Sequence, residues 1–287
     1  MMAKTFDVIV IGGGHAGIEA AWAASSVLPN GEIAFITMDH RNIGVMSCNP
    51  AIGGLGKGQI VREIDALGGI MARAIDATGI MFKMLNTSKG PAVWGPRAQA
   101  DKDAYRDEVQ RLIATRNNIK VIEATIDDLL VEEGKIKGVM LDEPVYANAV
   151  VLTTGTFMRG LMHTGDTQEK GGRVGEGTAD GISTTLRGLG FELGRLKTGT
   201  PPRLSKKSID WESLKVQLGD ETPTPFSDFL QKDFPSLSQV DCRITATTSE
   251  MHEQIKANLE RAPMYNDQID AESGPRYCPS IEDKVGR

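Results

Sequence analysis

The first forty residues alternate between apolar runs and a glycine-rich turn. Residues 6–11 (FDVIVI) form a short apolar run, which glycines follow directly, and residues 15–26 are rich in alanine with apolar positions at helical spacing. A second apolar run occupies 32–37. An order of strand, turn, helix and strand within roughly thirty residues is typical of a βαβ unit and predicts a parallel sheet.

The rest of the first half continues this pattern. Residues 101–115 place Tyr105, Val109, Leu112 and Ile113 on one side of an amphipathic helix. A glycine-rich stretch at 44–58 is poor in large side chains and predicts a loop. Apolar periodicity predicts further helices at 59–74 and 251–261, a strand at 120–123, a meander formed by 126–132 and 136–141, and a buried strand at 148–153.

The composition changes near residue 201, where prolines, serines and charged residues become frequent. We therefore predict a Rossmann-type α/β domain at 1–200, built on a parallel sheet with a β-meander. An inserted α+β segment is expected at 201–273. Residues 274–287 are expected to begin the return to the first domain.

Composition narrows the class of protein. The chain has 287 residues, 40% of them hydrophobic and 24% charged, with a formal net charge of −6. This is enough apolar material for a substantial core, and an acidic balance neither requires nor excludes a nucleic-acid partner. Three widely spaced cysteines without a CxxC pair argue against a disulfide scaffold, and the histidines show no metal-ligand spacing, so no metal site is predicted. No apolar run approaches the length of a membrane helix, so a cytoplasmic protein without membrane association is expected.

The glycine-rich turn carries the first functional signal. It fits G-x-G-x-x-G directly after a strand and at the start of a helix, through Gly12, Gly13, Gly14, His15, Ala16 and Gly17. In this context the motif predicts a dinucleotide whose pyrophosphate sits at the helix N-terminus. The motif alone does not choose between FAD and NAD. Glu19 is a small pointer to FAD, and Asp39, after the second strand, is either the ribose ligand or a solvated loop acid.

Several longer segments resemble one family. They are 46–58 (MSCNPAIGGLGKG), 65–69 (DALGG), 86–93 (NTSKGPAV), 97–101 (RAQAD), 194–203 (GRLKTGTPPR) and 274–284 (GPRYCPSIEDK). Together they resemble the MnmG/GidA family, FAD-dependent enzymes of tRNA uridine 5-carboxymethylaminomethyl modification. Because family members are much longer, the chain is interpreted as an N-terminal fragment, and its own activity stays open.

The resemblance implies a reaction and its components. The family works with the GTPase MnmE on carbon 5 of the wobble uridine of tRNA, with bound FAD, NADH as reductant and methylenetetrahydrofolate as one-carbon donor. A homodimer is implied for the full-length protein. The family's cofactor contacts correspond to the turn, Ile126 and Ala179, and its NAD-associated stretch begins at Gly274, Pro275, Arg276 and Tyr277. Ala179 stands where a serine is expected, so a side-chain hydrogen bond there is lost or moved. The resemblance makes 1–200 the FAD-binding domain.

Uridine carbon 5 is weakly nucleophilic, and addition of a thiolate at carbon 6 activates it. Cys48 and Cys278 lie in the family's motifs and are the candidate catalytic nucleophiles. For either cysteine the alternative is a small buried hydrophobe. Lys57 is either a phosphate or flavin neighbour or a solvated loop lysine. Candidate tRNA phosphate contacts are Lys89, Arg97, Arg195, Lys197 and Arg203.

Three alternatives remain beside the tRNA-modifying flavoenzyme. A plain NADH:flavin oxidoreductase would need neither the cysteine motifs nor RNA. The related folate- and FAD-dependent tRNA methyltransferase would share the dinucleotide turn. A truncated chain could also fold without catalysing anything.

Overall fold

The computed structural model describes residues 5–126, 128–229, 233–266, 268–269 and 280–285. Its main sheet has six strands in the order β6-β2-β1-β9-β8-β7. Four strands are parallel, and β7 and β8 join them as an antiparallel meander. The strands are β1 (Thr5–Ile11), β2 (Ile33–Thr37), β6 (Ile119–Glu123), β7 (Asp128–Glu132), β8 (Lys135–Met140) and β9 (Pro144–Leu152). The predicted α/β fold with a parallel sheet and a meander is confirmed.

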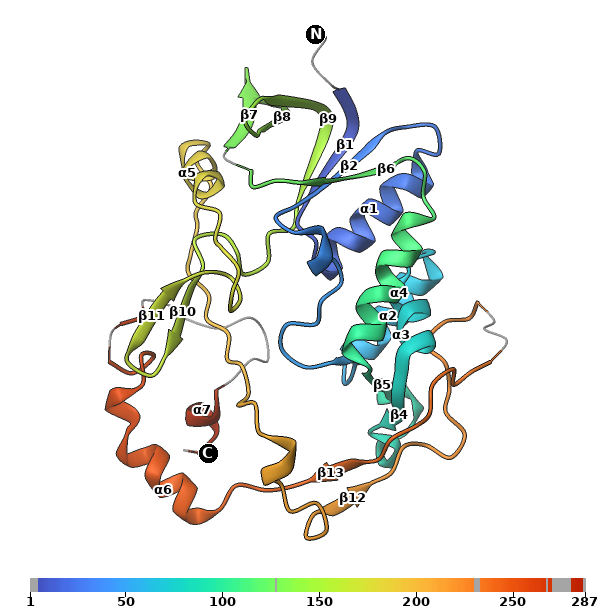
Figure 1. The fold of residues 1–287 in the computed structure, drawn as a ribbon, viewed down its shortest axis with the longest axis vertical. Helices are drawn as coiled ribbons and strands as arrows, with labels where there is room; N and C mark the ends of the chain where they lie inside the picture. Colours follow the sequence, from blue (N-terminus) through green and yellow to red (C-terminus); the bar gives the residue numbers. More distant parts are fainter. Residues whose placement is uncertain (1–4, 127, 230–232, 267, 270–279, 286–287) are drawn as a thin grey trace.

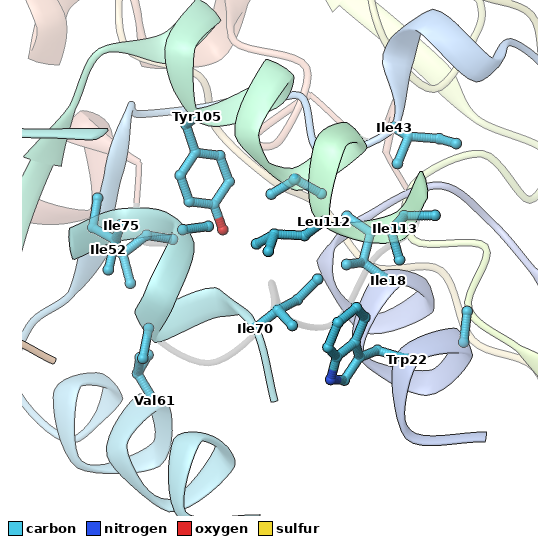
Figure 2. Close-up of a cluster of buried hydrophobic side chains, with 14 of the residues drawn as sticks. Ile18, Trp22, Ile43, Ile52, Val61, Ile70, Ile75, Tyr105, Leu112 and Ile113 are labelled. Carbon is cyan, nitrogen blue, oxygen red and sulfur yellow. The ribbon is translucent and has the colours of Figure 1, made fainter. Parts of the chain in front are cut away.

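One face of this sheet is covered by α1 (His15–Val27) and α4 (Lys102–Ala114) (Figure 1). The four predicted apolar residues of α4 are all buried, and Asp101 caps the helix by accepting the N–H groups of Asp103 and Ala104. The four apolar residues of α4 pack with Ile18 and Trp22 of α1 in the larger core cluster, part of which Figure 2 shows. The apolar residues that predicted α4 therefore also form part of the core against which α1 packs.

The opposite face of the sheet has its own smaller core. Successive residues of a strand point to opposite faces, and Ile9 accordingly lies in this second cluster while Val10 lies in the first. Ile182 of α5 (Gly181–Gly188) packs against this face, in one cluster with Ile126 and with Val139 of β8. The central strands β1 and β2 are thus buried on both sides, as is typical of a parallel sheet.

A second, antiparallel sheet was not predicted. It has the order β3-β5-β4, with β3 (Ala51–Gly53), β4 (Gly79–Leu85) and β5 (Gly95–Ala100). The prediction of a loop over all of 44–58 is therefore wrong, because β3 lies inside it and α2 starts at Lys57. The sequence of β5, GPRAQA, contains neither β-branched nor aromatic residues. Pairing with its neighbours, rather than local propensity, makes it a strand.

The predicted helix at 59–74 is also wrong, since the chain forms two helices, α2 (Lys57–Ala66) and α3 (Met71–Thr78). Gly68 adopts a left-handed conformation with φ of +87°, and its N–H and that of Gly69 close the end of α2 on the carbonyls of Asp65 and Ile64. Glycine readily adopts this helix-ending conformation. The helical periodicity continues across the break, which explains the error.

The remaining chain is less regular. A hairpin formed by β10 and β11 is followed by α5, and Figure 1 shows the chain then running down to β12 and β13 and on to α6 and α7. These elements are β10 (Leu161–Thr164), β11 (Thr167–Lys170), β12 (Lys215–Gln217), β13 (Cys242–Ile244), α6 (Ser249–Ala257) and α7 (Ile281–Val285). The predicted helix at 251–261 starts earlier, at Ser249, and changes to a 3₁₀ turn at Leu259–Arg261.

The predicted inserted segment is attached to the first domain by its middle part. Phe226 is 1% exposed and belongs to the larger core cluster. Arg62 of α2 donates to the carbonyl groups of Pro225 and Phe226 and forms an ion pair with Asp228. The division at residue 200 remains a prediction. Among the described residues, no helix is long and apolar enough to cross a membrane.

Candidate functional site

The turn between β1 and α1 has two positions that only glycine fits. Gly12 has φ of +110°, and a Cβ there would lie 2.4 Å from the carbonyl oxygen of Thr153. A Cβ on Gly17 would lie 1.8 Å from the carbonyl oxygen of Gly12. Both distances are far below a van der Waals contact. The glycines therefore allow α1 to start directly against the ends of β1 and β9.

Gly14 is different because a Cβ there would meet nothing within 4 Å. It is the N-cap of α1, no side chain caps the helix, and no acidic residue occupies the first turn. The first N–H groups of a helix lack intrahelical partners, and the helix dipole favours an anion beside them. The open space at Gly14 thus leaves room for an anion, and the N–H groups of the first helical turn are available as donors; pyrophosphate binding there stays a prediction.

His15 is the first residue of α1 and its imidazole is largely buried. Burial lowers the pKa of His15 below its ordinary value, which favours the neutral ring. The ring centroid lies 5.6 Å from that of Tyr105, and its Nε2 atom has no hydrogen-bond partner among the described residues. The side chain packs between α1 and α4, whereas the backbone of the turn faces the open space at Gly14.

Asp39 follows β2, as predicted, but it has partners within its own loop. It caps a 3₁₀ turn, His40–Asn42, and both of its carboxylate oxygens bind the guanidinium of Arg41, at 2.9 and 2.8 Å. This hydrogen bonding holds the pKa of Asp39 below its ordinary value. The carboxylate is therefore ionised and already satisfied, so a ribose would have to compete with Arg41. Ribose binding by Asp39 stays a prediction.

Glu19 has a structural partner that the sequence did not indicate. Its carboxylate accepts the N–H groups of Ile70 at 3.1 Å and Met71 at 2.7 Å. These are the unsatisfied donors at the start of α3. Burial raises the pKa of Glu19, while the two backbone hydrogen bonds oppose that rise. In this structure Glu19 is a cap between two helices.

The loop that carries Cys48 begins at the dinucleotide turn. The N–H of Gly44 donates to the carbonyl oxygen of Gly13 at 3.1 Å. Gln110 of α4 also holds this loop, because its side-chain amide donates to the carbonyl of Ile43. Cys48 is exposed and lies four residues after Gly44, which is at most about 14 Å of extended chain. The predicted nucleophile therefore lies within about 14 Å of Gly44, which is hydrogen-bonded to the dinucleotide turn.

Residues from two distant segments contact this loop. Arg173 donates to the hydroxyl of Ser47 at 3.0 Å and is paired with Glu176. Arg203 donates to the carbonyl oxygens of Cys48 and Ser47, and the Cys48 Sγ–H lies 3.9 Å from the carbonyl oxygen of Gly199. Sequence reasoning missed the role of Arg173, whose segment is one of the departures from the family pattern. No local signal indicated its contact with Ser47.

The other predicted basic residues have varied surroundings. Lys57 and Lys89 are exposed. Arg97 lies on β5 of the second sheet, and it opposes the rise that burial causes in the pKa of Cys242. Arg195 and Lys197 are bound to protein groups, the carbonyl of Arg159 at 3.3 Å and the carboxylate of Asp283 at 3.1 Å. Contact of any of these residues with tRNA stays a prediction.

The remaining predicted site residues divide into two groups. Ile126 and Ala179 are 4% and 9% exposed, and the N–H of Ala179 donates to the carbonyl of Phe157 at 2.9 Å. The carbonyl of Ala179 in turn accepts the N–H of Arg159 at 2.9 Å, so its backbone groups already have protein partners. Cofactor contact at Ile126 and Ala179 stays a prediction. Gly274, Pro275, Arg276, Tyr277 and Cys278 lie outside the described residues.

The structure thus defines an α/β protein with a Rossmann-type dinucleotide turn and an exposed cysteine loop beside it. A family model described as glucose inhibited division protein A matches residues 7–287. The chain belongs to this family, GidA/MnmG, as its motifs predicted.

Relatives and solved structures agree. The chain is 51% identical to tRNA uridine 5-carboxymethylaminomethyl modification enzyme MnmG of Rhodopirellula baltica, covering 98% of this chain and 44% of that protein. The MnmG of Granulibacter bethesdensis is also 51% identical, with 98% and 45% covered. The structure of Aquifex aeolicus GidA matches with a TM-score of 0.90 and 47% identity, over 98% of this chain and 48% of that one. The chain therefore spans less than half the length of these proteins.

Proposed function

We propose that this chain is the FAD-binding part of an enzyme that modifies carbon 5 of the wobble uridine in tRNA. The observation that carries the proposal is the turn at 12–17, where steric contacts require glycine at two positions and leave open space at Gly14. Membership of the GidA/MnmG family and the printed names of its relatives supply the reaction class.

FAD is the dinucleotide that we propose for the turn. The N–H groups at the start of α1 would hold the pyrophosphate, and Asp39 would reach the ribose if Arg41 moved aside. Ile126, Ala179 and residues 274–277 are proposed to complete the pocket and the approach of NADH. When bound, FAD supplies redox chemistry, and methylenetetrahydrofolate is proposed as the carbon donor.

Cys48 is the proposed nucleophile within the described part of the chain. Its thiolate would bond to carbon 6 of the uracil ring, and the electrons of the 5,6 double bond would move to the carbonyl at carbon 4 as an enolate. Carbon 5 could then attack the one-carbon electrophile. Loss of the proton at carbon 5 and departure of Cys48 would restore the ring. Exposure of Cys48 supports this role, because a tRNA base must reach the thiol. Cys278 is the second candidate.

The finer parts of the proposal concern partners. The GTPase MnmE, a homodimer and a cytoplasmic location are what family membership leads us to expect. Because the chain covers 44% and 45% of the two MnmG relatives named above, these properties are proposed for the whole protein. RNA binding by this part alone is expected to be weak.

Flavin binding is the first experiment. The purified chain should quench the fluorescence of added FAD and retain a flavin absorption spectrum after gel filtration, and Gly17→Ala should abolish both. A folded, colourless chain that does not change the fluorescence of added FAD would contradict the proposal and favour the inactive-fragment alternative.

The second experiment tests the reaction with the full-length protein. The wild type and Cys48→Ser should be compared with MnmE present, and the tRNA nucleosides identified by mass spectrometry. Carboxymethylaminomethyl-type uridine is the expected product, and Cys48→Ser should reduce it at least tenfold. 5-Methyluridine would instead identify the related methyltransferase, and flavin reduction by NADH without a modified nucleoside would identify a plain oxidoreductase.

A further inference from the structure

A segment without regular secondary structure crosses the Cys48 loop. Residues 191–205 belong to no helix or strand, and we call residues 194–203 the strap. No helical or sheet ladder holds its backbone, so side-chain contacts to the rest of the protein gain importance. Three of its basic residues, Arg195, Lys197 and Arg203, make such contacts.

One end of the strap is fixed at Cys48. The guanidinium of Arg203 binds the carbonyl oxygens of Cys48 and Ser47, so one side chain spans two consecutive peptide groups. Four residues earlier, the carbonyl oxygen of Gly199 lies 3.9 Å from Cys48 Sγ, within the range of a weak S–H donor. The strap therefore contacts both the backbone and the thiol of the same residue.

The other end is fixed at Asp283. Lys197 Nζ lies 3.1 Å from this carboxylate, and the Lys197 side chain is 17% exposed. Asp283 is held in turn by the hydroxyl of Tyr265 at 2.6 Å and by the N–H and hydroxyl of Ser280 at 2.9 and 3.1 Å. Three hydrogen bonds other than the ion pair therefore hold the Asp283 carboxylate in place, so Lys197 binds a fixed group. Only one residue, Thr198, separates Lys197 from Gly199.

We propose that Arg203 and Lys197 are positioning residues that hold the strap against the Cys48 loop and thereby set the position and reactivity of the Cys48 thiol. The proposal rests on the proposed function only for the catalytic use of the thiol. It also assigns these two basic residues to the protein's own backbone and carboxylate rather than to phosphates of tRNA.

The reactivity of the thiol tests this directly without a cofactor. The chain is treated with iodoacetamide, and alkylation of the Cys48 and Cys242 peptides is followed by mass spectrometry. Cys242 on β13 is a half-buried internal reference. Arg203→Gln and Lys197→Met should each increase the rate at Cys48 about threefold to tenfold, the effect of losing one hydrogen-bonded restraint, and leave Cys242 unchanged. Arg203→Lys should restore part of the wild-type rate, because an ammonium can still bind one carbonyl.

Lys207→Met is the matched control, since Lys207 is an exposed lysine just beyond the strap, and it should leave both rates unchanged. Lys197→Met, Asp283→Asn and their double variant should agree with one another if the ion pair acts as one unit. Wild-type rates at Cys48 in the Arg203→Gln and Lys197→Met variants would overturn the proposal. Equal acceleration of Cys48 and Cys242 with a lower melting temperature would also overturn it, because it would indicate general loosening.

Failure of this proposal is distinguishable from failure of the proposed function. If Cys48→Ser left tRNA modification intact, the thiol would not be the nucleophile, yet the alkylation rates would still report on the strap. If the alkylation rates were the same in the variants as in the wild type, the strap proposal would fail, whereas the tests of flavin binding and of tRNA modification would keep their outcomes.

Discussion

The carboxylate of Asp76 accepts the backbone N–H of Phe226 at 2.8 Å, although 150 residues separate the two in the sequence. Its second oxygen accepts the N–H of Ser227 at the same distance. Asp65, on the neighbouring helix, accepts the Ser227 hydroxyl at 2.7 Å and the N–H of Asp228 at 2.9 Å. Both carboxylates are buried. We call residues 225–228, with these two carboxylates, the clamp, which joins the predicted inserted segment to α2 and α3.

Asp76→Ala should destabilise the protein substantially. The substitution leaves the N–H groups of Phe226 and Ser227 buried without an acceptor, and each such group costs about 1–3 kcal/mol. We expect the free energy of unfolding in urea to fall by about 2–5 kcal/mol. Glu63→Ala, which removes an exposed carboxylate from α2, should change it by no more than about 0.5 kcal/mol. Equal effects of the two substitutions would show that the clamp is not formed.

The clamp should also make stability depend on pH. Burial raises the pKa of Asp76 from 3.8 to about 6. Because the folded value is the higher one, the protonated acid favours the folded state, and this contribution is lost as the pH rises through about 6. Relative to Asp76→Asn, the wild type should therefore lose about 2 kcal/mol between pH 4.5 and 7.5. Urea unfolding of both proteins across this range measures the difference, and parallel pH profiles would contradict it.

The sequence predicted the parts of the fold that depend on neighbouring residues. The β1–turn–α1–β2 unit and the apolar face of α4 are local patterns, so they could be predicted from the residues themselves. The clamp could not be, because its donors and acceptors lie far apart in the sequence. The contact between Arg203 and the Cys48 carbonyl spans 155 residues and was missed for the same reason. Both cysteine motifs were found by resemblance, whereas the groups that surround Cys48 needed the tertiary structure.

Two glycines of the dinucleotide turn should respond differently to alanine. Gly17→Ala places Cβ 1.8 Å from a backbone oxygen, so it should lower the free energy of unfolding by about 1–3 kcal/mol or more and abolish FAD binding. Gly14→Ala meets nothing within 4 Å, and its φ of −78° suits alanine. Its stability should stay within about 0.5 kcal/mol of the wild type, while FAD affinity falls roughly tenfold or more because the methyl group enters the pyrophosphate space.

Melting temperatures and fluorescence titration with FAD separate the two effects. Because Gly14→Ala should leave the fold intact, it is the more informative variant. Wild-type affinity in that variant would place the pyrophosphate elsewhere.

Glu19 allows a structural role to be separated from a cofactor role. Its carboxylate caps α3 through the N–H groups of Ile70 and Met71, and loss of a helix cap costs about 1–2 kcal/mol. Glu19→Ala should therefore lower the free energy of unfolding by that amount, and Glu19→Gln by less, since its amide oxygen can still accept one bond. FAD affinity of the folded protein should not change, because the carboxylate is committed to α3. Weaker FAD binding with unchanged stability would instead make Glu19 a cofactor ligand, as its place two residues after Gly17 first indicated.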